Sequence, residues 1–366
     1  MMTKVYNFNA GPSALPKEVL EEAQRNLVSF EGKGLSIMEM SHRSKDYELV
    51  HNETKSLLRK LLQIPDHYEV LFLQGGASLQ FSMIPFNFLQ KEKPAGFFLT
   101  GVWSKKAYEE AQKLGSVEVI ADSKDRNHSY IPSIDNDFEN KEFSYLHITS
   151  NNTIYGTQWK SFPKTKAPLI ADMSSDIASR KIPVEQFDLI YAGAQKNLGP
   201  SGVTVVILKK EMLSQIPDNL PTMLDYRTHT KANSLYNTPP TFSIYLMGLV
   251  LKWIENSGGI EAIEKQNKYK AQLLYDVLDS SEGFYEAVVD EDSRSLMNIV
   301  FRLPTEELTK QFLEEAEKVG FIGLAGHRSV GGCRASTYNA VPVEACVALA
   351  SFMKEFQLKS SLSNIC

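Results

Sequence analysis

The amino-acid sequence predicts an α/β protein with a large, mostly parallel seven-stranded sheet domain and a smaller α+β C-terminal domain. Two observations lead to this prediction. Apolar runs of strand length alternate with helical patterns between residues 69 and 208, and the character changes after residue 280 to a second strand–helix–strand–helix block. Alternating strands and helices form mostly parallel sheets with helices on both faces. The chain has 366 residues, so we expect an N-terminal arm at 1–16, a large domain at 17–257 and a small domain at 258–366.

The segment before the sheet is expected to be extended at first and helical later. Two prolines and a glycine within 1–16 disfavour a helix there. Apolar residues recur at helical spacing over 17–30 and over 46–64. The segment 31–44 between them is expected to be irregular.

The expected sheet strands are apolar runs bounded by turn residues or helices. They are 69–73, 96–100, 117–120, 145–149, 169–172, 189–192 and 203–208, with helices at 78–88 and 104–114. A long polar loop is expected next, followed by two helices, at 219–240, 241–256 and 260–278. The small domain is expected to combine extended segments with helices, at 285–289, 298–303, 305–319, 322–324 and 343–356, before a frayed polar tail from 359.

Composition excludes several classes of partner. The net charge is −5 and no basic block is present, so we expect no nucleic acid partner. The N-terminus has no apolar signal region, and the longest apolar run, 242–254, is too short to span a bilayer, so we expect a cytoplasmic protein. The three cysteines, Cys333, Cys346 and Cys366, have no zinc-type spacing, and their odd number argues against a disulfide framework. No metal site is expected.

Lys196 occupies the tight connection between two expected strands, 189–192 and 203–208, and a turn over 197–202 follows it. A lysine at such a strand end is partly desolvated, which lowers its pKa and frees the neutral amine to attack a carbonyl. Lys196 is therefore a candidate Schiff-base lysine. The alternative is a charged residue in a turn without chemistry.

Two further strand ends carry candidate binding groups. The turn 74–80 contains two glycines and Ser78, and a helix start in such a turn can hold a phosphate. It could equally be a plain strand–helix turn. Asp172 ends the strand 169–172 and could pair with a protonated ring nitrogen. Its alternative is a helix N-cap or a structural ion pair.

Trp103 and Thr153 follow two other strands. The Trp103 ring could stack on a flat cofactor, although a single tryptophan is more often part of a core. Thr153 lies in the loop after 145–149, where it could donate to a ring substituent or only shape a turn.

Two arginine-bearing segments complete the set of candidates. One contains His42 and Arg43, and the other contains His327, Arg328 and Arg334. Arginine binds carboxylate or phosphate groups with two parallel hydrogen bonds, so these residues suit a substrate with two anionic groups. Taken singly, each could be a solvated loop charge.

The whole set is more informative than its members. A phosphate cup, a stacking ring, a strand-end aspartate and a strand-end lysine occur in that order along an α/β domain. These are the groups that pyridoxal 5'-phosphate requires as anchor, ring partner, pyridinium partner and covalent attachment. A non-catalytic phosphate-binding protein would explain the glycines at 75–76 but not Lys196 or Asp172.

The sequence also resembles the phosphoserine aminotransferase family, which consists of class V, fold-type I transferases that use pyridoxal phosphate. The resemblance extends from the arm to about residue 356, and the last two of its five motifs are specific for this family. The motifs are Phe8-Asn-Ala-Gly-Pro-Ser13, Met40-Ser-His-Arg43, Ala194-Gln-Lys-Asn-Leu-Gly-Pro-Ser-Gly202, Tyr236-Asn-Thr-Pro-Pro240 and His327-Arg-Ser-Val-Gly-Gly-Cys-Arg-Ala-Ser-Thr-Tyr-Asn-Ala340. One departure is Cys333, where methionine is common in the family.

The resemblance implies roles around the cofactor. Lys196 would attach it and shuttle a proton, Asp172 would pair with its ring nitrogen, and Trp103 would stack on its ring. The other contacts would come from Ala77, Ser78, Thr153 and Gln195, and from Asn237 and Thr238 of the neighbouring subunit in a homodimer with shared active sites.

For the substrate, the resemblance implies that Arg334 holds the α-carboxylate. Arg43, His42, His327 and Arg328 would bind the phosphate or distal carboxylate. The implied reaction is transamination between phosphoserine and 2-oxoglutarate, giving phosphohydroxypyruvate and glutamate in serine biosynthesis. A related step of pyridoxine biosynthesis stays open.

Other class V enzymes are the nearest alternatives, for example an alanine–glyoxylate aminotransferase or a cysteine desulfurase. A desulfurase needs a nucleophilic cysteine on a mobile loop. Cys333 is the residue to consider, but its motif is better explained by its arginines.

Overall fold

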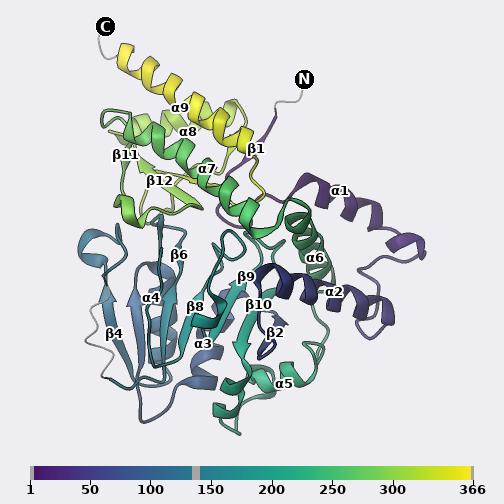
Figure 1. Cartoon of the computed structure of the whole chain (residues 1–366). Helices are drawn as coiled ribbons and strands as arrows, with labels where there is room; N and C mark the ends of the chain where they lie inside the picture. The colour runs from purple at the N-terminus through teal and green to yellow at the C-terminus, as the bar shows by residue number, and fades with distance from the viewer. Residues whose placement is uncertain (1–3, 134–140, 364–366) are drawn as a thin grey trace.

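The computed structural model describes residues 4–133 and 141–363, and its centre is a seven-stranded sheet (Figure 1). β10 runs antiparallel to both of its neighbours, and the other adjacent strands are parallel. This confirms the predicted mostly parallel sheet. The strands are, in spatial order, β2 Tyr68–Leu73, β10 Thr204–Lys209, β9 Leu189–Gly193, β8 Leu169–Asp172, β5 Tyr145–Thr149, β3 Ala95–Leu99 and β4 Val117–Asp122.

Helices cover both faces of this sheet because successive side chains of each strand point to opposite faces. In β2, Val70 and Phe72 join one apolar cluster, and Leu71 and Leu73 join the other. The first cluster includes α1 Lys17–Asn26, α2 Lys45–Leu62 and α6 Thr241–Asn256, and the second includes α3 Gly76–Phe88, α4 Val102–Gln112 and α5 Tyr226–Lys231. Each fully buried aliphatic or aromatic side chain contributes about 1.5–3 kcal/mol to this double-sided core.

The C-terminal part has an apolar cluster of its own and lies above the large sheet in the view of Figure 1. Phe301 and Phe312 pack edge to face at its centre, with ring centroids 5.8 Å apart. The elements are α7 Gly259–Asp279, β11 Glu286–Ala287, β12 Asn298–Arg302, α8 Glu306–Lys318, β13 Phe321–Ile322, β14 Cys333–Ser336 and α9 Val343–Ser363, with β11, β12 and β14 forming an antiparallel sheet. The domain bounds at 16 and 257 stay a prediction.

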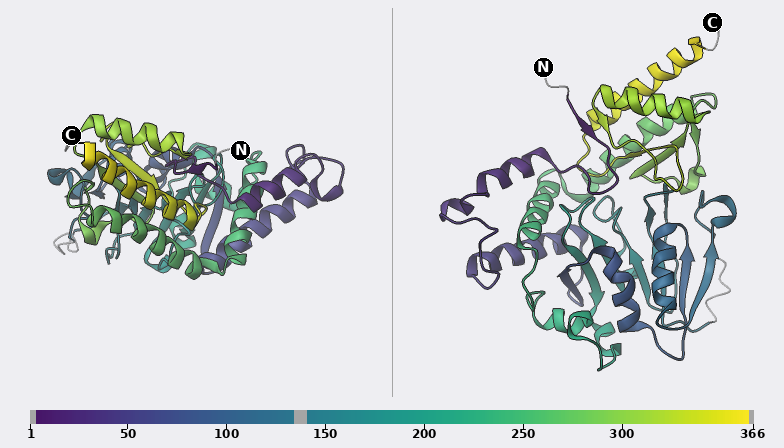
Figure 2. Two further views of the ribbon diagram at one scale, coloured as in Figure 1. Left: turned by 90° about the horizontal axis from the view of Figure 1, so that it is seen from above. Right: turned by 180° about the vertical axis from the view of Figure 1, so that it is seen from behind.

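The N-terminal arm is extended, as expected, and it pairs with the C-terminal part. β1 Tyr6–Asn7 runs parallel to β13, with Tyr6 opposite Phe321. Phe8 is fully buried in the C-terminal cluster. The view from behind in Figure 2 shows the arm beside the C-terminal elements. A hairpin follows β5, and each of its strands, β6 Asn151–Asn152 and β7 Thr157–Gln158, has two residues.

Three of the differences between the prediction and the structure concern helices. The expected loop at 219–240 contains α5, which starts where the Asp225 carboxylate accepts a hydrogen bond from the Arg227 N–H at 2.7 Å. The last helix does not end at 356 but continues to Ser363, because 357–363 contains no proline or glycine that would break it. The first helix ends at Asn26 rather than at 30. Cys366 lies outside the described residues.

Within the described ranges, the structure contains no helix of the length and apolarity needed to cross a membrane.

Candidate active site

A cavity of about 310 Å³ lies beyond the carboxyl ends of the large sheet. The ends of β5 and β8 reach it directly, and the segments after β2, β3 and β9 supply further walls. This is the position at which open α/β sheets bind ligands. The predicted site residues that line it are Ala77, Ser78, Trp103, Thr153, Asp172, Gln195, Lys196, His327 and Arg334.

Lys196, the predicted Schiff-base lysine, lines this cavity. Its Nζ donates a hydrogen bond to Thr153 Oγ1 at 2.7 Å. Burial, helped by the positive charge of Arg334 and opposed by the carboxylate of Asp172, lowers the pKa of Lys196 to about 8. About one such amine in ten is neutral at pH 7, compared with about one in 2,500 for an ordinary lysine. The neutral form is the nucleophile.

Asp172 ends β8 and is buried, with 5% of its surface exposed. The N–H of Ser174 donates to Asp172 Oδ1 at 2.9 Å, and the Ser174 hydroxyl accepts from the Gly193 N–H at 3.1 Å. These bonds tie the end of β8 to the end of β9 and orient the carboxylate. Burial raises the pKa of Asp172, while the Ser174 hydrogen bonds and the Lys196 charge act in the opposite direction. A buried carboxylate that is oriented in this way pairs strongly with a cationic hydrogen-bond donor.

The N-terminus of α3 points its free backbone N–H groups at the cavity. Leu79 is the first residue bonded back to the turn, with its N–H 3.2 Å from Gly75 O. The N–H groups of 76–78 precede that bond, and these residues line the cavity. Gly75 has φ +85°, and a Cβ there would lie 2.6 Å from Leu79 Cβ, so the turn requires glycine. The helix start can therefore hold an anion.

Trp103 and Arg334 each leave a buried donor without a partner. Trp103 Nε1 and Arg334 Nε are both inaccessible to solvent and unpaired among the described residues. Arg334 Nη1 donates to Thr153 O at 3.2 Å, and no described carboxylate forms an ion pair with this guanidinium. Because unpaired buried donors are costly, both groups fit a site that is completed by a ligand.

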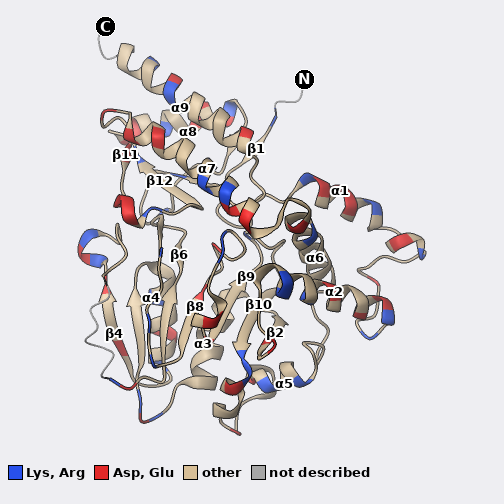
Figure 3. Ribbon diagram, in the orientation of Figure 1, with Lys and Arg blue, Asp and Glu red and all other residues tan. Residues whose placement is uncertain are grey.

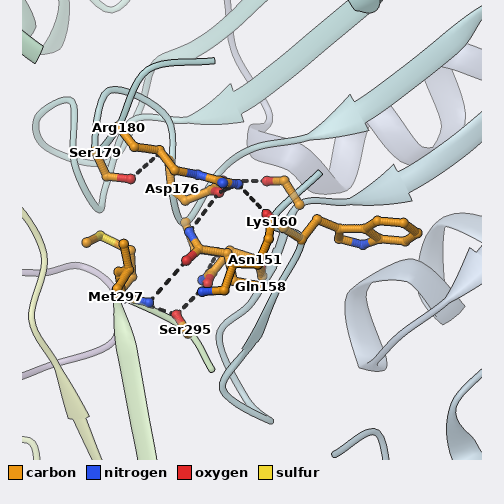
Figure 4. A network of polar contacts seen from close by, with 12 residues as sticks. Asn151, Gln158, Lys160, Asp176, Ser179, Arg180, Ser295 and Met297 are labelled. Carbon is orange, nitrogen blue, oxygen red and sulfur yellow. Dashed lines mark hydrogen bonds and ion pairs between the residues drawn. The ribbon is translucent and has the colours of Figure 1, made fainter. Parts of the chain in front are cut away.

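A buried polar network supports the cavity from behind (Figure 4). Asn151 Nδ2 donates to Ser175 Oγ at 2.8 Å, and both residues line the cavity. Next to them, the Asp176 carboxylate accepts from Gln158 Nε2 and Arg180 Nη2, each at 3.1 Å, and from the Ser150 hydroxyl. The network joins the end of β5, the β6–β7 hairpin and the turn after β8.

Five predicted site residues do not line the cavity. Arg328 is exposed in the loop that carries His327. Asn237 Nδ2 donates to Gln74 Oε1 at 3.3 Å, beside the α3 turn, and Thr238 is exposed next to it. The remaining two, His42 and Arg43, precede α2 outside the cavity.

Sequence reasoning missed several residues that line the cavity. Polar residues directly after β5 and β8 are a signal that could have identified part of this set. The arm residues offer no such signal, because only the fold brings them to the site. The missed residues are Ala10, Gly11, Thr149, Asn151, Ile154, Ser174 and Ser175.

Comparison with known proteins agrees with this geometry. Residues 5–349 match the family described as aminotransferase class-V. The chain belongs to the class-V aminotransferase family. Within this family it is 63% identical over 356 residues to the phosphoserine aminotransferase of Geobacillus kaustophilus (strain HTA426), covering 97% of this chain and 99% of that protein. It is 58% identical to the phosphoserine aminotransferase of Bacillus subtilis (strain 168), with the same coverage.

Solved structures of aminotransferases share its fold. The phosphoserine aminotransferase from Bacillus circulans subsp. alkalophilus superposes with a TM-score of 0.94 at 54% identity, covering 98% of this chain and 99% of that chain. A structure described as showing radiation damage of the Schiff base in phosphoserine aminotransferase has a TM-score of 0.93 at 57% identity, covering 97% of this chain and 99% of that chain. The predicted fold-type I architecture and the predicted family are therefore confirmed.

Proposed function

We infer that this class-V aminotransferase is a phosphoserine aminotransferase. It transfers an amino group between O-phospho-L-serine and 2-oxoglutarate, giving 3-phosphohydroxypyruvate and L-glutamate, in serine biosynthesis. The observation that carries the inference is a half-buried lysine with a lowered pKa in a cavity that also holds a buried carboxylate and an arginine whose Nε has no partner among the described residues. Curated relatives at 54–63% identity over the full chain support the choice of substrate.

The cavity fits pyridoxal phosphate as the cofactor. The α3 N-terminus would hold its phosphate through 76–78, Asp172 would pair with its ring nitrogen, and the Trp103 ring would cover its plane. Lys196 would attach it covalently, with Thr153 and Gln195 beside the ring. When bound, the cofactor supplies a carbonyl carbon for amine exchange and a protonated ring that accepts electrons from the substrate's Cα.

The protein's own groups then have separate tasks. Lys196 Nζ would take a proton from the substrate's Cα and deliver it to the carbon on the far side of the amino nitrogen, a transfer that a lysine with a pKa of about 8 can make in both directions near neutral pH. Thr153 Oγ1 receives the Nζ hydrogen bond and keeps the amine in the cavity. The Arg334 guanidinium binds the substrate's α-carboxylate with its free donors.

The distal anion needs a second positive cluster. His327 lines the cavity and Arg328 adjoins it in the same loop. We propose that His42 and Arg43 join them from a second subunit, and that Asn237 and Thr238 of that subunit reach the cofactor phosphate. A charged cluster accepts either a phosphate or a γ-carboxylate, as both half-reactions require.

Spectra of the two half-reactions test the function. The purified chain, loaded with pyridoxal phosphate and desalted, should absorb in the visible range. Phosphoserine should change that spectrum much faster than serine at equal concentration, because only phosphoserine carries the second anion. If the loaded protein shows no visible absorption, pyridoxal phosphate is not the cofactor. Equal rates with both amino acids would retain a transaminase but remove the phosphoserine assignment.

A further inference from the structure

The N-terminal arm is part of the wall of the active-site cavity. Ala10 and Gly11 line it together with Lys196. Gly11 has φ +147°, and a Cβ at this position would lie 3.3 Å from Lys196 Cε. The arm therefore passes directly along the lysine side chain, and a larger residue at this position would press against it.

Ser13 holds the backbone from which Lys196 projects. Its N–H donates to Gln195 O at 3.0 Å, and its Oγ donates to Lys196 O at 2.7 Å. The internal hydrogen bonds of the lysine turn, from the N–H groups of Leu198 and Gly199, both end on Ala194 O. The next two carbonyls of the turn are the ones that accept from Ser13.

The other end of the arm is fixed to the segment that carries Arg334. Tyr338 OH donates to Ala10 O at 2.8 Å, and the Ser336 N–H donates to Phe8 O at 3.3 Å. Ser336 is the last residue of β14, which also contains Arg334. The arm is thus held on both sides of the cavity and has little freedom at Ser13.

We propose that Ser13 is a positioning residue that fixes the peptide group of Lys196 and thereby keeps Nζ beside Thr153 in the cavity. The proposal rests on the proposed function, since it concerns the lysine that would attach the cofactor. A lysine side chain has four rotatable side-chain carbon–carbon bonds, so its amine can explore a large volume, and movement of the backbone enlarges that volume further. Ser13 restricts that volume through two consecutive peptide groups.

Competitive acetylation of the full chain without cofactor tests this role without any need for activity. Trace acetic anhydride labels each lysine in proportion to its neutral amine, and peptide masses identify the sites. In Ser13→Ala, the amine spends less time in the desolvated position, so labelling of Lys196 at pH 7 should fall about tenfold. With cofactor bound, kcat should fall about tenfold while KM for phosphoserine changes less than about twofold.

Two conservative variants and one matched control separate positioning from general destabilisation. Ser13→Thr keeps the hydroxyl and should label like the wild type, whereas Ser13→Cys, a weak donor, should lie between Thr and Ala. Ser144 also donates to a distant carbonyl, Lys93 O at 2.6 Å, but at the amino end of β5. Ser144→Ala should lower the melting temperature without changing Lys196 labelling.

Wild-type labelling and kcat in Ser13→Ala would overturn the proposal, as would an equal loss of labelling in Ser144→Ala. If Ser13→Ala does not fold, the order of Thr above Cys decides the matter. A wild-type chain that fails to transaminate phosphoserine would overturn the proposed function instead, and the labelling comparison would still decide the role of Ser13.

Discussion

At the scale of single residues, the pKa of Lys196 depends on burial and on the opposite charges of Asp172 and Arg334. Arg334 favours the neutral amine and Asp172 favours the ammonium, while burial lowers the pKa to about 8. Both residues line the same cavity as the lysine. For the proton carrier that we propose, a pKa of about 8 allows the amine both to accept and to release a proton near neutral pH.

This balance predicts opposite effects for two substitutions. In the chain without cofactor, the reactivity of Lys196 should rise with pH through a midpoint near 8. Arg334→Met removes a positive charge and should move this midpoint upward. Asp172→Asn removes a negative charge and should move it downward. Acetylation measured between pH 6 and pH 11 gives the midpoints, with the exposed Lys252 as a control that should not change. Shifts in the same direction would contradict the electrostatic account.

Single residues also show what sequence reasoning can find. Asp172 ends an expected strand, and Lys196 and Trp103 each follow one, so the sheet topology places all three at one edge. Ser13 and Tyr338 reach the site only through long-range hydrogen bonds. Nothing in local spacing predicts such contacts, because they depend on how the arm pairs with the C-terminal part.

At the scale of elements, the turn after β8 is stabilised by the buried ion pair of Asp176 and Arg180. Asp176 is 1% exposed, and the pair joins the turn to the β6–β7 hairpin through Gln158. Asn151 and Ser175, which line the cavity, lie in the same network. The ion pair of Asp176 and Arg180 therefore restrains the part of the cavity wall that Asn151 and Ser175 form.

Removing one member of this pair should be costly. Arg180→Leu leaves a buried carboxylate without its cation and should lower the free energy of unfolding by about 3–5 kcal/mol. The matched control is Lys60→Leu, which breaks the exposed 2.7 Å pair with Glu255 and should cost about 0–1 kcal/mol. Urea denaturation of both variants measures the difference. Similar losses would mean that Asp176 does not depend on Arg180.

Elements were predicted well where burial controls the pattern. The strands β5 and β8 have the predicted bounds, since both are fully buried apolar runs. The helix α5 was missed because its six residues, 226–231, are mostly polar and depend on the Asp225 cap rather than on an apolar stripe. The short strand β14 was missed because glycines precede it and its partner β12 lies more than 30 residues away.

For the molecule as a whole, charged residues of both signs are spread over the helices, whereas the strands of the large sheet are mostly uncharged (Figure 3).

The cavity of one chain does not contain every predicted binding group. His42, Arg43, Asn237 and Thr238 lie outside the cavity lining. A second copy of the chain is our proposed source of these groups.

Mixing two inactive variants tests this arrangement. Lys196→Ala removes the amine of a subunit's own site, and Arg43→Ala should damage the site of its neighbour. If the sites are shared, a mixed dimer contains one intact site, so an equal mixture should recover about a quarter of wild-type activity after subunit exchange. A mixture of Lys196→Ala with Lys196→Met is the control and should recover none. No recovery in the first mixture would place Arg43 in its own subunit's site, and an Arg43→Ala variant that is active by itself would place Arg43 outside both sites.

The parallel pairing of β1 with β13 has a consequence for the order of folding. Tyr6 leaves the ribosome long before its partner Phe321, because more than 300 residues separate the two along the chain. The sheet strands up to β10 can pair earlier, whereas the contacts that pass from the arm to the lysine turn must wait for the C-terminal segments. A nascent or truncated chain can thus contain Lys196 and a folded sheet and still lack a fully formed catalytic centre.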